Sequence, residues 1–440
     1  MLKSKKGMQQ AACEGKRRVI GFTSASAIVV SSMIGTGIFT TTGLMAEMGA
    51  TGGDILLAWA IGGLVALCGA LCYAEIGANL PQSGGEYHYL SRLLHPALGF
   101  MSGCVSLIVG FAAPIAAAAM GMHLYLGKII AGWPVRAMAA ATILVLSLLH
   151  AYDLRLGSRV QTALTVLKIL LIAAFIFGIL FGASNASQLS SIDFKPALGA
   201  SSQFAVVLVF VSFAYSGWNA SAYIGAEIAN PSRSLPRSLI AGTVLVAAIY
   251  LLINLSYLSA APLSAISGVE SVAHTVAERL WGEAGGRIVS TAIALTLVVP
   301  VSAMILIGPR VAEAMARDRL MPGLFARLNS RGVPSYAVFL QAALAAAVAV
   351  TSSFDSLLVY IGFTLNIFAA LTVLSLFRLR LRGESRHRVC LWYPVTPIIF
   401  LAFAAWMTIW SINGKPRATL AGVGTLAVCY LIYLLRSKIV

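Results

Sequence analysis

Long uninterrupted apolar runs constrain this chain of 440 residues more than any other feature of its sequence. They are rich in Leu, Ala, Ile and Val and recur from one end of the chain to the other. A helix rises about 1.5 Å per residue, so roughly 20 apolar residues cross a hydrocarbon core about 30 Å thick. Strands of a membrane barrel would instead alternate in hydrophobicity over about ten residues. The runs therefore predict membrane-spanning helices.

Composition agrees, because 59% of the residues are hydrophobic and 10% are charged, whereas soluble domains carry about 25% charged residues. We expect an all-α membrane protein of about twelve transmembrane helices, with boundaries good to several residues. The predicted spans are residues 19–46, 54–79, 97–127, 134–150, 158–182, 201–226, 237–260, 287–309, 335–353, 355–377, 391–411 and 416–435. The polar segment 261–286 has helical spacing and is expected to form a short helix over an entrance on the outside.

Positive charge is distributed unevenly between the predicted loops. With the N-terminus in the cytoplasm, loops on that side hold 23 of the 31 Lys and Arg, and those on the other side hold seven. Acidic residues divide almost evenly. This is the positive-inside pattern, so both termini are expected in the cytoplasm of a multi-pass protein of the bacterial inner membrane. The net charge of +16 then reflects topology rather than nucleic acid binding.

Two predicted spans are interrupted near their middle. The first contains Gly35, Thr36 and Gly37, and the sixth contains polar and aromatic residues over 215–219. Each has a simple structural explanation alone, since small residues and Asn also pack helices in membranes. Four spans separate them, however, so they occupy matching positions in two sets of five. Interruptions at matching positions point to a transporter site built on inverted repeats.

A broken helix at membrane depth has a specific chemistry. Unwound backbone is tolerated there only where it lines a cavity or is buried in protein. Half-helix N-termini present free N–H groups to an anion, and half-helix C-termini present carbonyls to a cation. A zwitterionic amino acid carries both charges, although other small zwitterions would also fit.

Several motifs along nearly the whole chain resemble those of the amino acid–polyamine–organocation (APC) superfamily of permeases. Each is weak alone, but their order and spacing are specific. FAYSGWN is most similar to the L-type amino acid transporter branch. The motifs are IGTGIF at 34–39, PxSGGEYxYL at 81–90, FAYSGWN at 213–219, NPSRSLPRS at 230–238 and GPRVAEAMARDRLMP at 308–322.

The resemblance implies a LeuT-type fold of two inverted five-helix repeats plus two further helices. The expected divisions are a cytoplasmic N-terminus (1–18), the first repeat (19–182), the second repeat (200–380) and transmembrane helices 11 and 12 (390–436).

The resemblance also implies substrate-binding residues. Backbone N–H groups around Gly35, Thr36 and Gly37 would hold the substrate carboxylate, and backbone carbonyls near both breaks would receive its ammonium. Phe213 would also be an aromatic gate, and Asn219 would brace the unwound segment. No charged wall is obvious, which favours neutral amino acids. The expected carbonyls and supporting positions belong to Met33, Ile34, Phe213, Ala214, Ser216 and Asn219.

Lys168 lies near the middle of the fifth predicted span, too deep to reach the interface. An ammonium there is costly and by default indicates function. VQTALTVLK at 160–168 resembles a pattern in which a lysine replaces the sodium ion of sodium-coupled relatives. We expect its ammonium to contact the first span near Ser31 and Ile34, with Ser302 as a further partner, and transport to be independent of sodium. Burial favours the neutral amine, so Lys168 is a candidate proton carrier, whereas a permanently charged lysine would support exchange.

Three glutamates are candidate gating residues. Glu75, Glu86 and Glu227 flank predicted cytoplasmic ends of spans and are expected to pair with arginines such as Arg92 or Arg310.

The sequence contains no phosphate loop, nucleophile elbow, metal-ligand cluster or paired catalytic carboxylates, so we expect neither an enzyme nor a bound metal or cofactor. The expected partners are an amino acid, membrane lipid and, where transport is proton-coupled, a proton, without nucleic acid or an evident partner subunit. Two alternatives remain open. A polyamine or organic-cation transporter would need acidic residues facing the pocket, and a transport-inactive sensor would need a signalling domain or partner.

Overall fold

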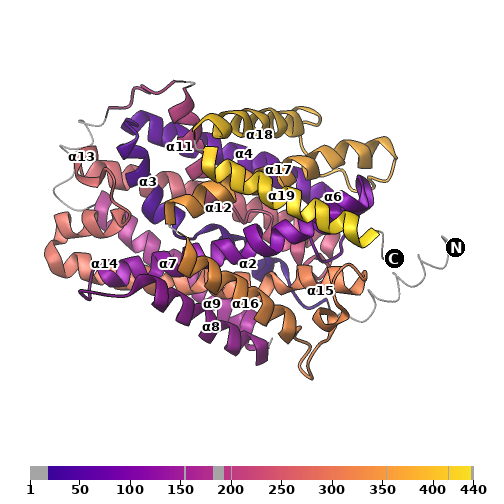
Figure 1. Cartoon of the computed structure of the whole chain (residues 1–440). Coiled ribbons are helices and arrows are strands. Elements are labelled where there is room, and N and C mark those ends of the chain that lie inside the picture. Colours follow the sequence, from indigo (N-terminus) through magenta and orange to yellow (C-terminus); the bar gives the residue numbers. More distant parts are fainter. Residues whose placement is uncertain are drawn as a thin grey trace.

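The computed structural model describes residues 18–152, 155–181, 193–199, 201–352, 354–414 and 416–437. Within these ranges the chain forms helices that lie side by side in one bundle (Figure 1), and its β-pairing is limited to isolated bridges. The prediction of an all-α protein is confirmed for these residues.

The helices of the bundle follow one another with short connections. α13 and α15 lie at opposite ends of the bundle in Figure 1. The elements are α2 (Phe22–Met33), α3 (Gly37–Glu47), α4 (Gly52–Asn79), α5 (Glu86–Leu93), α6 (Pro96–Val105), the π-helix η1 (Ser106–Ala112), α7 (Ala113–Gly127), α8 (Val135–Tyr152), α9 (Arg155–Leu180), α11 (Ser202–Tyr215), the 3-10 turns η2 (Ala220–Tyr223) and η3 (Gly225–Glu227), α12 (Pro231–Ala260), α13 (Leu263–Ile266), α14 (Val272–Ile307), α15 (Pro309–Arg317), the 3-10 turn η4 (Gly323–Ala326), α16 (Ser335–Thr351), α17 (Phe354–Leu381), α18 (Val395–Gly414) and α19 (Pro416–Ser437).

Seven helical segments of the described chain are long and apolar enough to cross a membrane, and five shorter apolar helices accompany them. Each of the twelve predicted spans overlaps one of these segments. The seven are Phe22–Glu47, Gly52–Asn79, Pro96–Gly127, Val135–Tyr152, Pro231–Ala260, Val272–Arg317 and Tyr360–Leu381, and the five are Thr165–Leu180, Ser202–Tyr215, Ser335–Thr351, Val395–Trp410 and Thr419–Leu435.

Both predicted interruptions are breaks in helical structure. α2 ends at Met33 and α3 begins at Gly37, so the first break covers residues 34–36. α11 ends at Tyr215, and the chain continues through Gly217, whose φ of 97° suits glycine, into the 3-10 turns η2 and η3. After its break, the sixth predicted span therefore does not resume as an α-helix, whereas the first predicted span resumes as α3.

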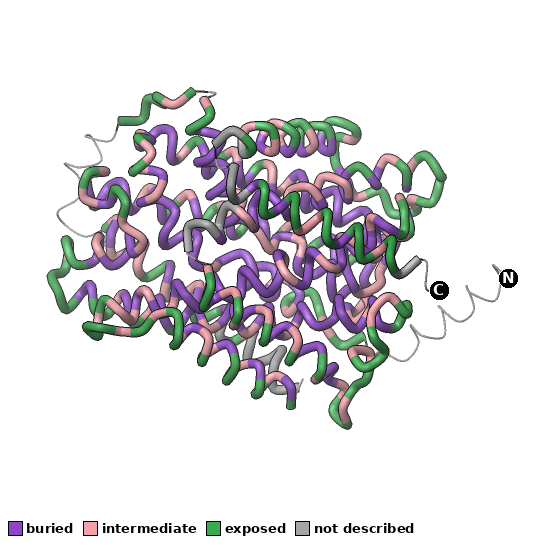
Figure 2. Tube along the Cα trace, viewed as in Figure 1, coloured by how far each residue is buried: buried purple, intermediate pink, exposed green. Residues whose placement is uncertain are grey.

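Buried residues occupy the middle of the bundle, where α12 packs along α4 and α2, and α14 packs along α7 (Figure 2). Outer helices keep exposed apolar side chains, for example Leu148 and Leu149 of α8 and Leu435 of α19. Such faces suit contact with lipid, because hydrocarbon solvates leucine as well as a protein core does.

The polar segment 261–286 is helical in part, as predicted. It contains α13 and the first part of α14, which is kinked where Gly282 has a φ of 70°. The segment packs on α3, since a Cβ at Gly43 would lie 2.1 Å from the Val269 carbonyl oxygen. Its expected position over an entrance stays a prediction.

A buried carboxylate joins the start of α4 to the segment that precedes α11. Asp54 caps α4 reciprocally with Thr51, and its carboxylate also accepts hydrogen bonds from the backbone N–H groups of Ala197 and Leu198. Several donors compensate the charge of this side chain, so we expect Asp54 to hold the two segments together.

We predict that Asp54→Asn lowers the thermal unfolding midpoint of the purified protein. The amide has one acceptor oxygen and leaves buried N–H groups unpaired, which costs about 1–3 kcal/mol. The matched control is Glu283→Gln, which removes an exposed helical ion pair with Arg287 and is expected to change little. Equal midpoints for the two variants would contradict the role of Asp54.

Candidate functional site

The two breaks pack directly against each other, and the contact is reciprocal. A Cβ at Gly37, just after the first break, would lie 2.6 Å from the Cβ of Ala214, just before the second. A Cβ at Gly217 in the second break would lie 2.8 Å from the backbone of Ser32, just before the first. Glycine is therefore required at both positions by close approach of the backbones.

Tyr250 of α12 connects the two breaks by bonding backbone carbonyls at the ends of α2 and α11. Its hydroxyl oxygen lies 2.6 Å from the carbonyl oxygen of Met33 and 2.9 Å from that of Ala214. The side chain is fully buried. Since a hydroxyl has one proton, it donates to one of these carbonyls at a time.

A small cavity lies between the breaks. Its volume is about 20 Å³, which accommodates roughly one water molecule, so the cavity is closed to an amino acid in this conformation. Seven of the nine residues predicted to bind substrate line it. They are Met33, Gly35, Thr36, Gly37, Phe213, Ala214 and Ser216.

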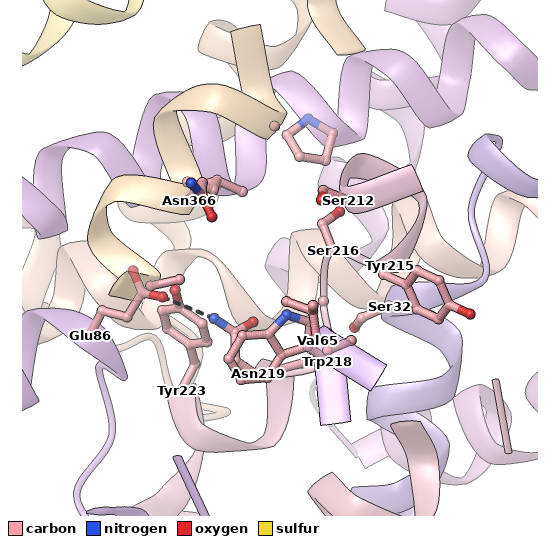
Figure 3. Close-up of a pocket in the computed structure, with 18 of the residues that line it drawn as sticks. Ser32, Val65, Glu86, Ser212, Tyr215, Ser216, Trp218, Asn219, Tyr223 and Asn366 are labelled. Atoms are coloured by element: carbon pink, nitrogen blue, oxygen red, sulfur yellow. Dashed lines mark hydrogen bonds between the residues drawn. The ribbon is translucent and has the colours of Figure 1, made fainter. Parts of the chain in front are cut away.

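The remaining two predicted binding residues lie nearby but outside this cavity. Ile34 is buried, and its carbonyl is occupied by Lys168. Asn219 lines a larger cavity of about 110 Å³ (Figure 3). Ser216 lines both cavities, as do Ser32 and Met304, so the two spaces adjoin.

Lys168 of α9 is fully buried, and its ammonium donates a hydrogen bond to the carbonyl of Ile34 in the first break. The two serines that the sequence analysis named beside Lys168 form hydrogen bonds with other residues. Ser31 donates to the carbonyl of Ile28, and Ser302 bonds His150 at 2.8 Å. Ser302 differs from the expectation because α14 packs against α8 at this level and brings His150 to it.

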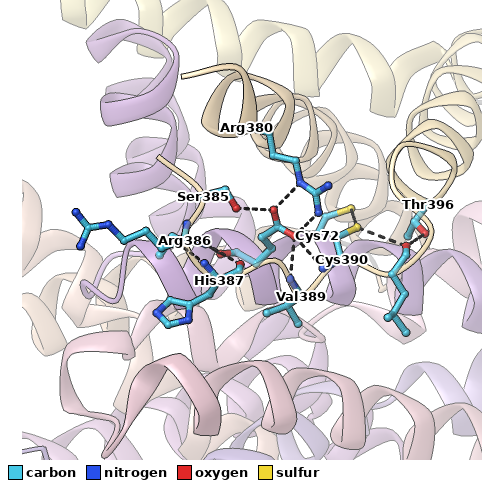
Figure 4. A network of polar contacts seen from close by, with 11 residues as sticks. Cys72, Arg380, Ser385, Arg386, His387, Val389, Cys390 and Thr396 are labelled. Atoms are coloured by element: carbon cyan, nitrogen blue, oxygen red, sulfur yellow. Dashed lines mark hydrogen bonds and ion pairs between the residues drawn. The ribbon is translucent and has the colours of Figure 1, made fainter. Parts of the chain in front are cut away.

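Glu75 lies in the last turns of α4, and its partners include Arg380, Ser385 and Cys390, which Figure 4 labels. Its carboxylate accepts hydrogen bonds from Nε and Nη2 of Arg380 at 2.7 and 2.6 Å, from Ser385 and from the backbone N–H groups of Val389 and Cys390. Glu75 therefore pairs with an arginine, as expected, but the partner is Arg380 rather than Arg92 or Arg310, because α17 packs along α4.

Glu86 and Glu227 differ from each other. Glu86 accepts hydrogen bonds from Tyr73 and Asn219, at 2.6 and 3.0 Å, so the expected arginine is wrong there. α5 starts at Glu86 and turns its side chain toward the cavity rather than toward a loop. Glu227 lies 3.3 Å from Nε of Arg310, one of the two arginines expected.

Sequence reasoning missed several cavity residues. Tyr250 is one of several tyrosines in apolar runs, and its role depends on the crossing of α12 with both breaks. Pro114 and Pro300 also line the small cavity. A proline within a predicted span could have indicated them, because proline disturbs the regular hydrogen bonding of a helix. Among the described residues, no group of three His, Cys, Asp or Glu is arranged to hold a metal ion.

Comparisons with known proteins agree over nearly the whole chain. Residues 20–435 match the family model described as amino acid permease. The chain is 32% identical over 409 residues to the serine/threonine exchanger SteT of Bacillus subtilis (strain 168), covering 88% of this chain and 90% of that protein. It is 28% identical over 425 residues to the human large neutral amino acids transporter small subunit 2 (93% and 78% covered) and 28% identical over 414 residues to the human b(0,+)-type amino acid transporter 1 (91% and 84%).

We predict that Gly37→Ala destabilises the protein, because the new methyl group would meet Ala214 at 2.6 Å and neither backbone can withdraw cheaply. Overpacking of this kind costs about 1–3 kcal/mol. The measurement is the thermal unfolding midpoint in detergent.

Gly35→Ala is the matched control in the same break. Its Cβ would meet only the Met33 carbonyl oxygen, at 4.0 Å, so the midpoint should stay close to that of the unmodified protein. A drop in Gly35→Ala as large as that in Gly37→Ala would mean that the contact between the breaks does not set the stability.

Proposed function

The chain belongs to the amino acid permease family, and on that premise we propose that it transports amino acids across a membrane by alternating access. The observation that carries the proposal is the reciprocal packing of two broken helices around a buried cavity. Its relatives are named as transporters or exchangers of amino acids rather than as enzymes.

The proposed architecture has twelve transmembrane helices, with inverted repeats over 19–182 and 200–380 and two additional helices over 390–436. The contact of Gly37 with Ala214, answered by that of Gly217 with Ser32, is the relation expected of two elements linked by a pseudo-twofold axis. Residues 1–17 lie outside the described residues. By the positive-inside bias, both termini would face the cytoplasm of a bacterial inner membrane.

The substrate would bind with its carboxylate at the start of α3. The first N–H groups of a helix lack partners within it, and the helix dipole favours an anion there. Gly35 itself donates to the Met33 carbonyl, which leaves Thr36 and Gly37 as the better placed donors.

The substrate ammonium would bind the carbonyls at the ends of α2 and α11. Those of Met33 and Ala214 already face Tyr250, and that of Phe213 accepts from the Ser216 N–H. A carbonyl oxygen has two lone pairs, so those of Phe213 and Ala214 can each accept a second donor. The Met33 carbonyl already accepts from the Gly35 N–H, so it has a lone pair for the ammonium only when Tyr250 donates to Ala214 instead. Because the small cavity is closed, binding would require the breaks to separate, with Phe213 moving as a gate.

Sodium independence is proposed from the position of Lys168. Its ammonium supplies a positive charge directly to the backbone of the first break, through the Ile34 carbonyl. A sodium ion placed at this carbonyl would meet a like charge at close range.

Alternating access also needs contacts that can open at one end of the bundle. The pairs Glu75–Arg380 and Glu227–Arg310 are the proposed gates. Each joins elements from different parts of the chain, so breaking it would release one group of helices from another.

We expect neutral L-amino acids to stabilise the purified protein in a thermal-shift screen. A ligand that binds the folded state raises stability by about 2.7 kcal/mol at 100 times its Kd. The screen should include common amino acids and a few amines, each with sodium or with choline as the cation. A response to amines alone would overturn the amino acid substrate, and a response that requires sodium would overturn sodium independence.

We predict that Lys168→Ala lowers amino acid uptake into proteoliposomes at least about tenfold, since a hydrogen bond from a charged group contributes about 1.5–3 kcal/mol. Uptake is measured with and without a pH gradient. The control is Lys128→Ala, at an exposed lysine that ends α7. Unchanged uptake in Lys168→Ala would remove this residue from the mechanism.

A further inference from the structure

The carboxyl group of Glu86 lies in the wall of the larger cavity, and its residue is only 3% exposed. The local sequence SGGE explains why the Glu86 side chain lies at this cavity. Gly84 and Gly85 have φ angles of 110° and 53°, which turn the chain so that α5 begins at Glu86. A Cβ at Gly85 would also lie 2.6 Å from the ring of Tyr223, so glycine lets α5 approach the cavity closely.

Both donors to this carboxyl group converge on one of its oxygens. Tyr73 and Asn219 each donate to Oε1, and Figure 3 shows the side chains of Glu86 and Asn219 next to each other in the cavity lining. Within the described part of the chain, Oε2 has no hydrogen-bond donor and no cation within ion-pair distance. One oxygen is therefore fixed and the other is available.

Among the described residues, the side chains found to interact with Glu86 carry no positive charge. Tyr73 comes from α4, Tyr89 from α5 itself and Tyr223 from η2, and all three interact with it electrostatically as neutral phenols. Burial raises the pKa of Glu86 to about 7, although the hydrogen bonds from Tyr73 and Asn219 act in the opposite direction. Glu86 therefore changes charge within the physiological range of pH.

Glu75 provides a comparison within the same molecule. It is also buried, but a bidentate arginine, a hydroxyl and two backbone N–H groups compensate its charge. Glu86 has two neutral donors on one oxygen. Buried charges are tolerated when paired, so the arrangement at Glu75 suits permanent ionisation and that at Glu86 does not.

We propose that Glu86 binds a proton that crosses the membrane together with the amino acid, which rests on the proposed transport function. The proton adds to Oε2 from the cavity and converts the carboxylate to a carboxylic acid. Oε1 then remains the carbonyl oxygen that accepts from Tyr73 and Asn219, so no hydrogen bond has to break. Release of the proton on the other side restores the carboxylate.

Asn219 connects this proton to the substrate. It belongs to the second break, whose Ser216 lines both cavities. A hydrogen bond to a carboxylate is about twice as strong as one to a neutral acceptor, so protonation loosens the hold of Glu86 on Asn219. The segment that closes the small cavity is thereby released when Glu86 is neutral and held when Glu86 is ionised.

The experiment uses the full-length protein in liposomes that contain a pH-sensitive dye. Adding an amino acid outside, at equal pH, should acidify the interior, and an inward proton gradient should drive accumulation. Glu86→Gln keeps an acceptor oxygen for Tyr73 and Asn219 but cannot bind the proton. We expect it to lose at least about nine-tenths of the proton flux while exchange of labelled amino acid continues, and we expect Glu283→Gln, at an exposed carboxylate, to behave as the unmodified protein.

Tyr73→Phe is the second variant, and it retains the carboxylate. It removes a donor that stabilises the ionised form, so the pKa of Glu86 should rise and proton coupling should persist to higher pH. An unshifted pH profile in this variant would contradict the proposal even if Glu86→Gln failed to fold.

Other outcomes separate this proposal from the transport function. Normal exchange without proton movement, or proton flux in Glu86→Gln equal to that of the unmodified protein, would overturn the role of Glu86 alone. Stabilisation by putrescine or agmatine that Glu86→Gln abolishes would show instead that the carboxylate binds an organic cation. A flat thermal response to every amino acid would overturn the transport function and this proposal with it.

Discussion

Backbone groups freed by two helix breaks must find partners inside the protein, and this constraint organises the rest of the structure. In hydrocarbon an unpaired N–H or C=O costs several kcal/mol. The carbonyl of Ile34 is satisfied by Lys168, and those of Met33 and Ala214 share the hydroxyl of Tyr250. Helices α9 and α12 therefore have to pass beside the breaks, which fixes their place in the bundle.

The same constraint explains why the buried charges are so differently surrounded. Asp54 and Glu75 collect several donors each and join segments distant in sequence. Glu86 has two neutral donors and faces a cavity, and Lys168 has a backbone carbonyl. Well-compensated carboxylates suit permanent ionisation, whereas weakly compensated groups suit a change of protonation or of partner during a transport cycle.

The closeness of the breaks also limits how the bundle can move. Gly37 and Gly217 allow contact at the backbone level, so a change at one break is felt at the other. Tyr250 of α12 bonds the carbonyls at both breaks, and Asn219 of the second break bonds Glu86 at the start of α5. In the proposed cycle, opening the small cavity would alter these hydrogen bonds and thereby engage Glu86 and the gating pairs at the ends of the helices.

The sequence by itself determined the helical class, the approximate limits of the apolar segments and the positions of both breaks, because apolar runs, glycine and polar residues act locally on helix formation. It also indicated that Lys168 would meet the first break. Only the tertiary structure decided that Glu75 pairs with Arg380, that Ser302 bonds His150 and that Glu86 faces a cavity. Those partners come from helices far apart in the chain, and their meeting depends on which helices cross and at what level. Residue spacing carries no information about that.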